Sequence, residues 1–252
     1  MAKVGFIGTG EITTALVRGL RGQGHQILVS ERNAETAARL AAEIPGVKVA
    51  ANETVVAQSD IIFLCLLARV ANDVLPNLPF RAGQSVVSVM VDVSIDKLRA
   101  LCAPATDIAI TIPLPPIATG GCPLPVYPGS AALVALYGGR NMVFTVRDEQ
   151  ALNAHFAATA LCSPLLEQIL TTATWLAGLT GDQHQAEAYV GAVIRGYLPE
   201  VLAPGQLAGD LQSLSTEGGL NATLRAAMSG ANADLRSGLD GFRKRLGLPG
   251  VE

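Results

Sequence analysis

The sequence predicts an α/β protein with an N-terminal Rossmann-type doubly wound parallel sheet and an all-helical C-terminal domain. Three observations predict this fold class. Short apolar runs alternate with helical patterns through the first half of the chain. A glycine-rich turn follows the first of these runs. From residue 171 onward the patterns are helical and rich in alanine, leucine and glycine.

The apolar runs are continuous rather than alternating, which is typical of strands buried on both faces of a parallel sheet. Because crossovers between parallel strands are short and right-handed, a doubly wound sheet is the most economical topology. The expected strands cover residues 4–8, 26–30, 47–50, 60–67, 85–91 and 107–113, and the expected helices cover residues 12–22, 34–44 and 95–102.

Residues 113–128 differ in kind, because they hold six of the 14 prolines of the chain. We expect neither a helix nor a central strand there, since proline lacks the N–H that both need. The segment leaves the carboxyl edge of the sheet, where doubly wound folds bind ligands; the alternative is a rigid connector. Beyond it we expect two more strands, at residues 131–139 and 142–146, and a helix at residues 148–161.

Composition narrows the class of partner. The chain has 252 residues, of which 50% are hydrophobic and only 15% are charged, and its formal net charge is −3. A chain this apolar can bury enough surface to fold, which excludes most disordered proteins. The isoelectric point of 5.7 counts against nucleic acid as the main partner, because nucleic-acid-binding domains are usually basic.

We expect a cytoplasmic protein without a membrane segment. The N-terminus lacks the pattern of a secretory signal, and the longest strongly apolar run, residues 61–68, is far too short to span a bilayer. The four cysteines are scattered and have no partner at zinc spacing, so we expect buried free thiols and no metal site.

Residues 8–13, with the sequence GTGEIT, lie between the first expected strand and its helix. In a dinucleotide-binding turn the first glycine makes the tight turn, the second lets the backbone approach a pyrophosphate, and the phosphate lies on the helix N-terminus. Thr13 replaces the third small residue. Glu31, 21 residues after Gly10, has the spacing of a ribose-binding carboxylate. The residues that we assign to the turn are Gly8, Thr9, Gly10, Glu11 and Ile12.

The choice of cofactor, NADP or NAD, depends on the end of the second strand. Glu31 accepts hydrogen bonds from a 2′-hydroxyl and repels a 2′-phosphate, which favours NAD. Ser30, Arg32 and Asn33 surround it with donors that can hold a 2′-phosphate, which favours NADP. We lean towards NADP. The expected domains are therefore residues 1–168, which bind the dinucleotide, and residues 169–252, which form the helical dimerisation and substrate domain.

Residues 5–20, GFIGTGEITTALVRGL, resemble the opening of pyrroline-5-carboxylate reductases. The resemblance continues weakly at residues 112–116 (IPLPP) and 215–221 (STEGGLN). It implies that the N-terminal domain binds NAD(P)H, that the helical domain pairs with a second subunit, and that the paired-glycine loop holds the carboxylate of a cyclic imino acid. The resemblance adds Leu66 and Leu67 to the cofactor-binding residues. The substrate-binding residues that it implies are Pro113, Pro115, Gly218, Gly219 and Asn221.

Several positions depart from that family. Its glycine-serine-glycine-proline-alanine-tyrosine stretch is replaced by residues 178–184, its lysine-proline by residues 67–69 (LAR), and the threonine after the paired glycines by Asn221. The resemblance therefore implies the fold and the cofactor, whereas the segments that would bind the substrate differ from the family's.

Reduction of an imine needs few catalytic side chains, because a protonated C=N is already electrophilic. The protein has mainly to position it against the nicotinamide. Our catalytic candidates are Asn221, Thr216 and His184. The alternative for Thr216 is a helix N-cap, and the alternative for His184, which can donate a proton near neutral pH, is an ordinary surface histidine.

These patterns predict an NAD(P)H-dependent oxidoreductase that acts on the C=N of a small cyclic imine or imino acid. One alternative is reduction of another small C=O or C=N substrate. A second is a non-catalytic, dinucleotide-binding regulatory protein. The β-hydroxyacid dehydrogenases share the two-domain layout, but their C-terminal-domain lysine has no counterpart, since the lysines are Lys3, Lys48, Lys97 and Lys244.

The low charge content predicts a partner chain. Helices on the surface of a monomer normally carry a polar face, whereas the helices after residue 171 are poor in charge. We therefore expect a homodimer built through the C-terminal helices.

Overall fold

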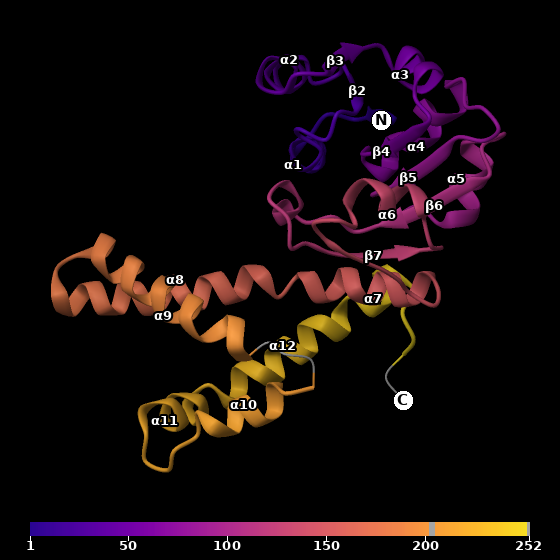
Figure 1. Cartoon of the computed structure of the whole chain (residues 1–252). Helices are drawn as coiled ribbons and strands as arrows, with labels where there is room; N and C mark the ends of the chain where they lie inside the picture. Colours follow the sequence, from indigo (N-terminus) through magenta and orange to yellow (C-terminus); the bar gives the residue numbers. More distant parts are fainter. Residues whose placement is uncertain (202–204, 251–252) are drawn as a thin grey trace. The chain divides into compact units, whose positions relative to one another are not determined.

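The computed structural model describes residues 1–201 and 205–250 (Figure 1). The chain divides into two compact units, Met1–Phe156 and Ala157–Glu252. The boundary expected after residue 168 falls within helix α8 (Cys162–Thr180). No helix of the described ranges is both long enough and apolar enough to cross a membrane.

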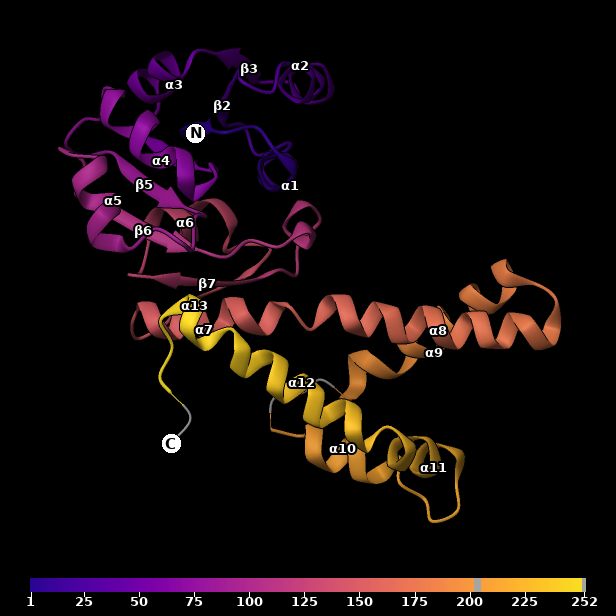
Figure 2. The same ribbon diagram turned by 180° about the vertical axis from the view of Figure 1, so that it is seen from behind.

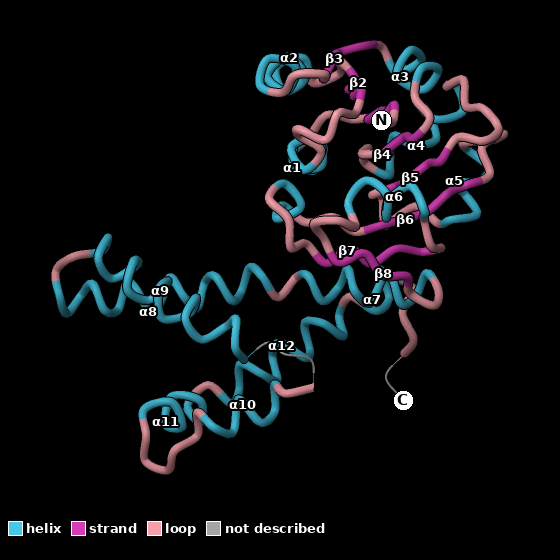
Figure 3. The backbone as a smooth tube through the Cα atoms, in the orientation of Figure 1, coloured by secondary structure: helices cyan, strands magenta, loops and turns pink. Residues whose placement is uncertain are grey.

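The N-terminal unit contains an eight-stranded sheet in the order β3-β2-β1-β4-β5-β6-β7-β8. All neighbouring strands are parallel except β6 and β7, which are antiparallel. Figure 3 shows the strands of this sheet in magenta. The strands are β1 (Lys3–Ile7), β2 (Gln26–Ser30), β3 (Val47–Ala50), β4 (Ile61–Leu64), β5 (Ser85–Ser88), β6 (Asp107–Thr111), β7 (Pro123–Tyr127) and β8 (Met142–Thr145). The Rossmann-type prediction is confirmed.

Helices cover both faces of this sheet, which explains why its strands are apolar throughout. One face packs against α1, α2 and α6 through a cluster that includes Phe6 and Phe63, whose rings stack with centroids 5.0 Å apart. The other face packs against α3, α4 and α5. The helices are α1 (Glu11–Gly19), α2 (Ala34–Glu43), α3 (Asn52–Gln58), α4 (Ala68–Val74), α5 (Ile95–Leu101), α6 (Ala131–Tyr137) and α7 (Glu149–Thr159), with 3-10 turns η1 (Leu75–Asn77) and η2 (Pro115–Ala118).

The prediction of a strand at residues 131–139 is wrong, because this segment forms helix α6. Ser130 caps the helix, and its side chain accepts a hydrogen bond from the backbone N–H of Leu133. The buried side chains follow a helical period, with Leu133, Leu136 and Tyr137 on the inner face. A short apolar run fits a strand and a buried helix equally well, and here the N-cap at Ser130 favours the helix.

Strand β7 is a second correction, because it lies between β6 and β8 although its segment is rich in proline. The carbonyl of Val126 accepts from the backbone N–H of Val146 on the β8 side. Pro125 faces β6 instead, where its carbonyl accepts from Thr111 Oγ1 at 2.8 Å. Since β6 pairs with β7 only through its last two residues, the missing N–H of Pro125 leaves no ladder hydrogen bond unmade.

The C-terminal unit is helical over its described residues. It comprises α8, α9 (Gln183–Val201), α10 (Leu207–Ser213), α11 (Leu220–Ala227), α12 (Ser229–Gly241) and α13 (Arg243–Leu246). Helices α8 and α9 form a hairpin (Figures 1 and 2), with Ala173, Ala186 and Val190 buried. Gly181, at φ +81°, ends α8 in the left-handed region. Asp182 then accepts from the N–H of Gln185 in the first turn of α9.

The four cysteines are free, but they are not all buried as expected. Cys102 and Cys122 are buried and Cys65 is half-buried, whereas Cys162 is exposed at the start of α8. The expectation of buried thiols is therefore wrong for Cys162, which lies on the solvent side of its helix.

Candidate cofactor and substrate site

The turn between β1 and α1 has the geometry that the glycine spacing predicts. Gly8 has φ +94°, and a Cβ there would lie 2.4 Å from the carbonyl oxygen of Cys65, so only glycine fits. Gly10 is the N-cap of α1, and a Cβ on it would meet no atom within 4 Å. No side chain caps α1. The N–H groups of its first turn, at Glu11 and Ile12, are therefore free to bind a phosphate in open space.

Three hydroxyl groups brace this turn. The backbone N–H of Gly8 donates to Ser30 Oγ at 2.8 Å, and Thr13 Oγ1 donates to the Gly8 carbonyl at 2.6 Å. Thr9 Oγ1 donates to the Ser30 carbonyl at 2.6 Å. Both polar groups of Gly8 are thus held by side chains. The sequence marked Thr13 only as a departure from a small residue, and the role of its hydroxyl was missed.

The end of β2 lies beside the turn, because β1 and β2 are parallel neighbours. Ser30 is buried, and its hydroxyl is engaged with Gly8. Glu31 and Arg32 are exposed and make no hydrogen bond or ion pair with the described residues. Asn33 caps α2 by accepting from the N–H of Thr36. The charged groups of Glu31 and Arg32 are therefore open to solvent at the end of β2.

Leu66 and Leu67 follow β4, the other neighbour of β1. Leu66 is half-buried, and its Cδ2 lies 3.2 Å from the position of a Cβ on Gly8. Leu67 is 60% exposed immediately before α4. Burial raises the pKa of the neighbouring Cys65 thiol to about 12, so this sulfur stays protonated and is a poor nucleophile. Leu66 and Leu67 are thus apolar neighbours of the turn.

The proline-rich segment packs on α1 at the same edge of the sheet. Pro113 is buried after β6, and Pro115 is exposed at the start of η2. Gly19 of α1 allows the close approach, because a Cβ there would lie 2.6 Å from the Ile117 carbonyl oxygen. The segment is therefore a connector that also presents Pro115 beside the carboxyl ends of the strands.

The remaining candidates lie in the helical unit. Gly218 has φ +72°, and the N–H of Gly219 donates to the carbonyl of Thr216 at 2.9 Å. Gly219 is the N-cap of α11, so the alternative of Thr216 as the N-cap is wrong. Asn221 is exposed in the first turn of α11, where no side chain caps the helix. Thr216, Gly218, Gly219 and Asn221 therefore lie together at the start of α11, whose first turn no side chain caps.

His184 is separate from that loop. It is exposed in the first turn of α9, and its side chain makes no hydrogen bond with any described residue. The α8–α9 turn that carries it and the loop before α11 lie apart in both ribbon views (Figures 1 and 2). Within the sheet unit the structure thus gathers the cofactor candidates at the ends of β1, β2 and β4. Within the helical unit it gathers Thr216 with Gly218, Gly219 and Asn221 and places His184 apart from them.

Comparison with known proteins identifies the fold. Residues 3–92 match the family model described as "NADP oxidoreductase coenzyme F420-dependent". No curated protein sequence gives a significant match. The similar solved structures include a pyrroline-5-carboxylate reductase from Streptococcus pyogenes, with a TM-score of 0.80 at 18% identity, covering 97% of this chain and 98% of that chain. This chain has the fold of those reductases.

Two further structures extend the likeness. A pyrroline carboxylate reductase from Plasmodium falciparum with NADP bound has a TM-score of 0.79 at 15% identity, covering 97% of each chain. An imine reductase from a Pseudomonas species has a TM-score of 0.66 at 18% identity, covering 98% of this chain and 88% of that chain. At these identities the pyrroline-5-carboxylate reductase likeness is one of fold, over nearly the full length of both chains.

Proposed function

We propose that this chain is an NADPH-dependent reductase that transfers hydride to the C=N bond of a small cyclic imine or imino acid. The observation that carries the proposal is the braced turn at Gly8–Gly10, with its open space over the N-terminus of α1. The likeness in fold to pyrroline-5-carboxylate and imine reductases, over nearly the whole chain, supports the C=N substrate class.

The residues around the turn fit a dinucleotide. Gly8, Thr9 and Gly10 place the backbone against the pyrophosphate, and the N–H groups of Glu11 and Ile12 donate to it. Leu66 and Leu67 border the turn with apolar surface. The bound nucleotide supplies the hydride, and the chain supplies its position.

NADPH is the preferred cofactor in this proposal. Because Ser30 Oγ is engaged with Gly8, we assign the serine to the turn, and we assign the 2′-phosphate to Arg32 by a charge-assisted hydrogen bond. Support comes from the NADP oxidoreductase model that matches residues 3–92 and from the NADP bound in the Plasmodium falciparum enzyme. Glu31 is then left to hydrogen-bond a neutral hydroxyl.

Arg32→Ala tests this preference. It should weaken NADPH binding about 10- to 100-fold, because a hydrogen bond to a charged group contributes about 1.5–3 kcal/mol. NADH affinity should stay within about twofold, since NADH lacks the phosphate. Arg39→Ala, an exposed arginine on α2, removes the same charge and should change neither affinity. An equal loss of NADPH and NADH binding in Arg32→Ala would contradict the assignment.

For the substrate we propose that the loop before α11 binds a carboxylate. The backbone donors near Gly218 and Gly219 and the side chains of Thr216 and Asn221 suit an anion. Pro115, exposed at the start of η2, offers rigid apolar surface beside the cofactor turn, whereas Pro113 is buried and is not part of that surface. His184 remains the candidate proton donor, because a histidine side chain can act as a general acid.

We also propose that the helical unit pairs with a second copy of the chain. Its helices expose apolar side chains that a monomer would be expected to bury. A groove of about 570 Å³ between the start of α8 and α12 adds Leu165, Leu235 and Phe242 to this apolar surface. The exposed apolar residues of the unit include Leu161, Leu165, Leu166, Leu170, Trp175, Leu179, Tyr189, Val193, Tyr197, Leu207, Leu211, Leu220, Leu224 and Met228.

The experiment that tests the proposed function has two steps. The first titrates NADPH and NADH into the protein and into Gly10→Val, which places a side chain where the pyrophosphate would lie. Gly139→Val is the matched control, because a Cβ on Gly139 also meets no atom within 4 Å. We expect saturable NADPH binding that only Gly10→Val abolishes. If the unmodified protein bound neither NADPH nor NADH, the proposed reductase activity would be refuted.

The second step follows NADPH oxidation with a panel of cyclic imines, imino acids and 2-oxo acids. We expect turnover with a cyclic imine. The second candidate function is reduction of another C=O or C=N substrate, which the replacements at residues 178–184 and at Asn221 favour. Turnover confined to 2-oxo acids would establish that candidate. Cofactor binding without any turnover would indicate a regulatory protein instead.

A further inference from the structure

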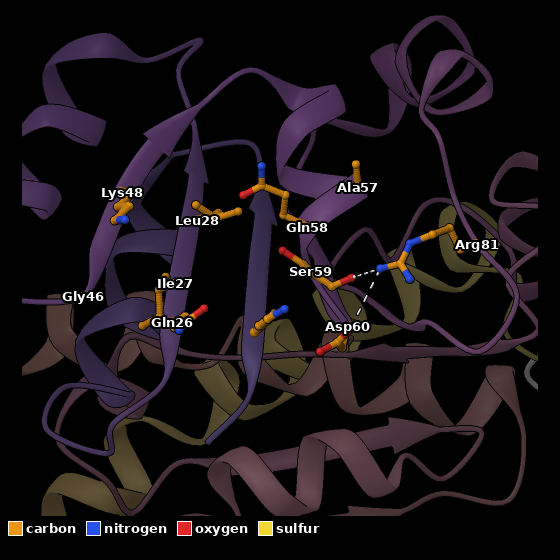
Figure 4. Close-up of a pocket in the computed structure, with 11 residues that line it drawn as sticks. Gln26, Ile27, Leu28, Gly46, Lys48, Ala57, Gln58, Ser59, Asp60 and Arg81 are labelled. Carbon is orange, nitrogen blue, oxygen red and sulfur yellow. Dashed lines mark hydrogen bonds and ion pairs between the residues drawn. The ribbon is translucent and has the colours of Figure 1, made fainter.

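We propose that the amino-terminal edge of the sheet carries a second ligand site, for a small organic dianion, in a hollow of about 620 Å³ over β2 and β3 (Figure 4). This hollow lies at the opposite end of β1 from Gly8 and its turn. It is therefore separate from the cofactor turn.

The register of strands β1, β2 and β3 determines which side chains form the floor of the hollow, that is, the sheet surface at its base. In parallel strands, paired residues point to the same face, as do residues two apart in one strand. Lys3 pairs with Gln26, and Leu28 pairs with Gly5 on one side and with Lys48 on the other. Lys3, Gln26, Leu28 and Lys48 therefore project from one face of the sheet.

Helix α3 forms one side of the hollow. It packs closely on β1, because a Cβ on Gly5 would lie 2.5 Å from Ser59 Oγ and 2.8 Å from Val55 Cγ1. The last residues of α3, Ala57 and Gln58, then border the hollow. Figure 4 shows Lys48 on the strand side of the hollow and Gln58 and Ala57 on the helix side. The same face over β2 and β3 is left open between them.

The hollow is positively charged in a chain whose net charge is −3. Lys3 and Lys48 line it, and their ammonium groups make no ion pair or hydrogen bond with the described residues. The third cation, Arg81, lies 3.9 Å from the carboxylate of Asp60 and donates to the Ser59 carbonyl. Asp60 is the single carboxylate of the lining, so the two lysines leave an uncompensated charge of two.

The spacing of the lysines suits one dianion. Lys3 and Lys48 stand two strands apart and two residues out of register, which separates their Cα atoms by about 12 Å, and their long flexible side chains can both reach a group between them. The amides of Gln26 and Gln58 add donors, while Leu28 and Ala57 supply apolar surface. Pockets of about 300–1,000 Å³ hold small molecules. These features indicate an organic anion with two negative charges and a small apolar body.

Phenyl phosphate is the probe, with inorganic phosphate beside it, and calorimetry measures binding to the full chain. We expect saturable binding of phenyl phosphate, tighter than that of inorganic phosphate because of the apolar floor. Lys3→Gln/Lys48→Gln should weaken it at least about tenfold, the loss of two charge-assisted contacts. Lys97→Gln/Lys244→Gln, which removes the other two lysines and the same charge, should leave it unchanged.

Gly10→Val separates this site from the cofactor turn. Phenyl phosphate should bind this variant as it binds the unmodified protein, whether or not the proposed reductase activity is found. Lys48→Gln alone provides a milder variant should the double change impair folding, as monitored by circular dichroism. Absence of saturable binding, loss of binding in Gly10→Val, or binding that the Lys3/Lys48 changes leave intact would overturn the proposal.

Discussion

The two units of the chain differ in how they treat apolar side chains. The sheet unit buries its large ones, such as Phe6, Phe63 and Tyr137, between strands and helices. Among described residues of the helical unit, the buried hydrophobic side chains are mostly small, while Trp175 is 67% exposed and Leu179 is 69% exposed. A single chain thus buries the large apolar side chains of the sheet unit but leaves many of those of the helical unit exposed. The buried strands explain one part of the low charge content, and the proposed pairing of the helical unit with a second copy would explain the other.

The largest effect is expected in the sheet core. Phe63→Ala removes a fully buried ring that stacks on Phe6 and meets Tyr137 edge-on. It should lower the free energy of unfolding by about 3–5 kcal/mol, measured by denaturant titration. Val134→Ala, at an exposed position of α6, should cost less than about 0.5 kcal/mol. A loss of less than about 1 kcal/mol in the free energy of unfolding of Phe63→Ala would show that the core of the sheet unit is not tightly packed around this ring.

Substitutions on the exposed apolar face of the helical unit should weaken the association of two chains rather than the folding of one chain. Trp175→Glu/Leu179→Glu places two charges on the exposed face of α8. Because burying an unpaired charge is costly, the dimer dissociation constant should rise at least about 100-fold, the effect of roughly 2.7 kcal/mol. Sedimentation velocity measures the change. Val134→Glu, which changes an exposed apolar residue of the sheet unit, is the control. An equal rise of the dissociation constant in this variant would contradict the assignment of the dimer interface to the helical unit.

Within the sheet unit, Ser30→Ala tests the brace of the cofactor turn. The change leaves the N–H of Gly8 without its acceptor and should cost about 1–3 kcal/mol of stability. NADPH affinity should fall as the turn loosens. Ser130→Ala also removes a buried hydroxyl that accepts from a backbone N–H, but at the cap of α6. It should destabilise without changing NADPH affinity; equal affinity losses in both variants would contradict the role of Ser30.

The smallest effect concerns the thiols. Burial raises the pKa of Cys65 and of Cys102 to about 12, so both stay protonated and unreactive at mildly alkaline pH. Cys162 is exposed on the helical unit. Brief alkylation followed by mass spectrometry should modify Cys162 first, and labelling of Cys65 or Cys102 should appear only on unfolding. Early modification of Cys65 would mean that its surroundings open in the folded protein.

The sequence predicts those parts of the fold in which a local pattern decides the outcome. The first strand, the glycine turn and the first helix follow from continuous apolar residues, from Gly8 and from Gly10. Residues 131–139 were assigned wrongly because a short apolar run fits a strand and a buried helix alike. Strand β7 was missed because the cost of Pro125 depends on which neighbour its missing N–H faces, and this is set by tertiary pairing.

The candidate site divides in the same way. The spacing of Gly8, Gly10 and Glu31 identified the turn and the neighbouring strand end, since the Rossmann unit fixes their separation. The hydroxyl of Thr13 could not be assigned from spacing, because its partner, the Gly8 carbonyl, depends on the exact path of the turn. The exposure of Cys162 likewise depends on which face of α8 lies outward.

The most direct test of the contrast between the units is sedimentation velocity of the unmodified chain across the micromolar range. The sheet unit closes its core alone, whereas the helical unit exposes Trp175, Leu179 and Tyr189. We therefore expect the mass of a dimer or of a larger even-numbered assembly at every concentration. A stable monomer throughout would contradict the account.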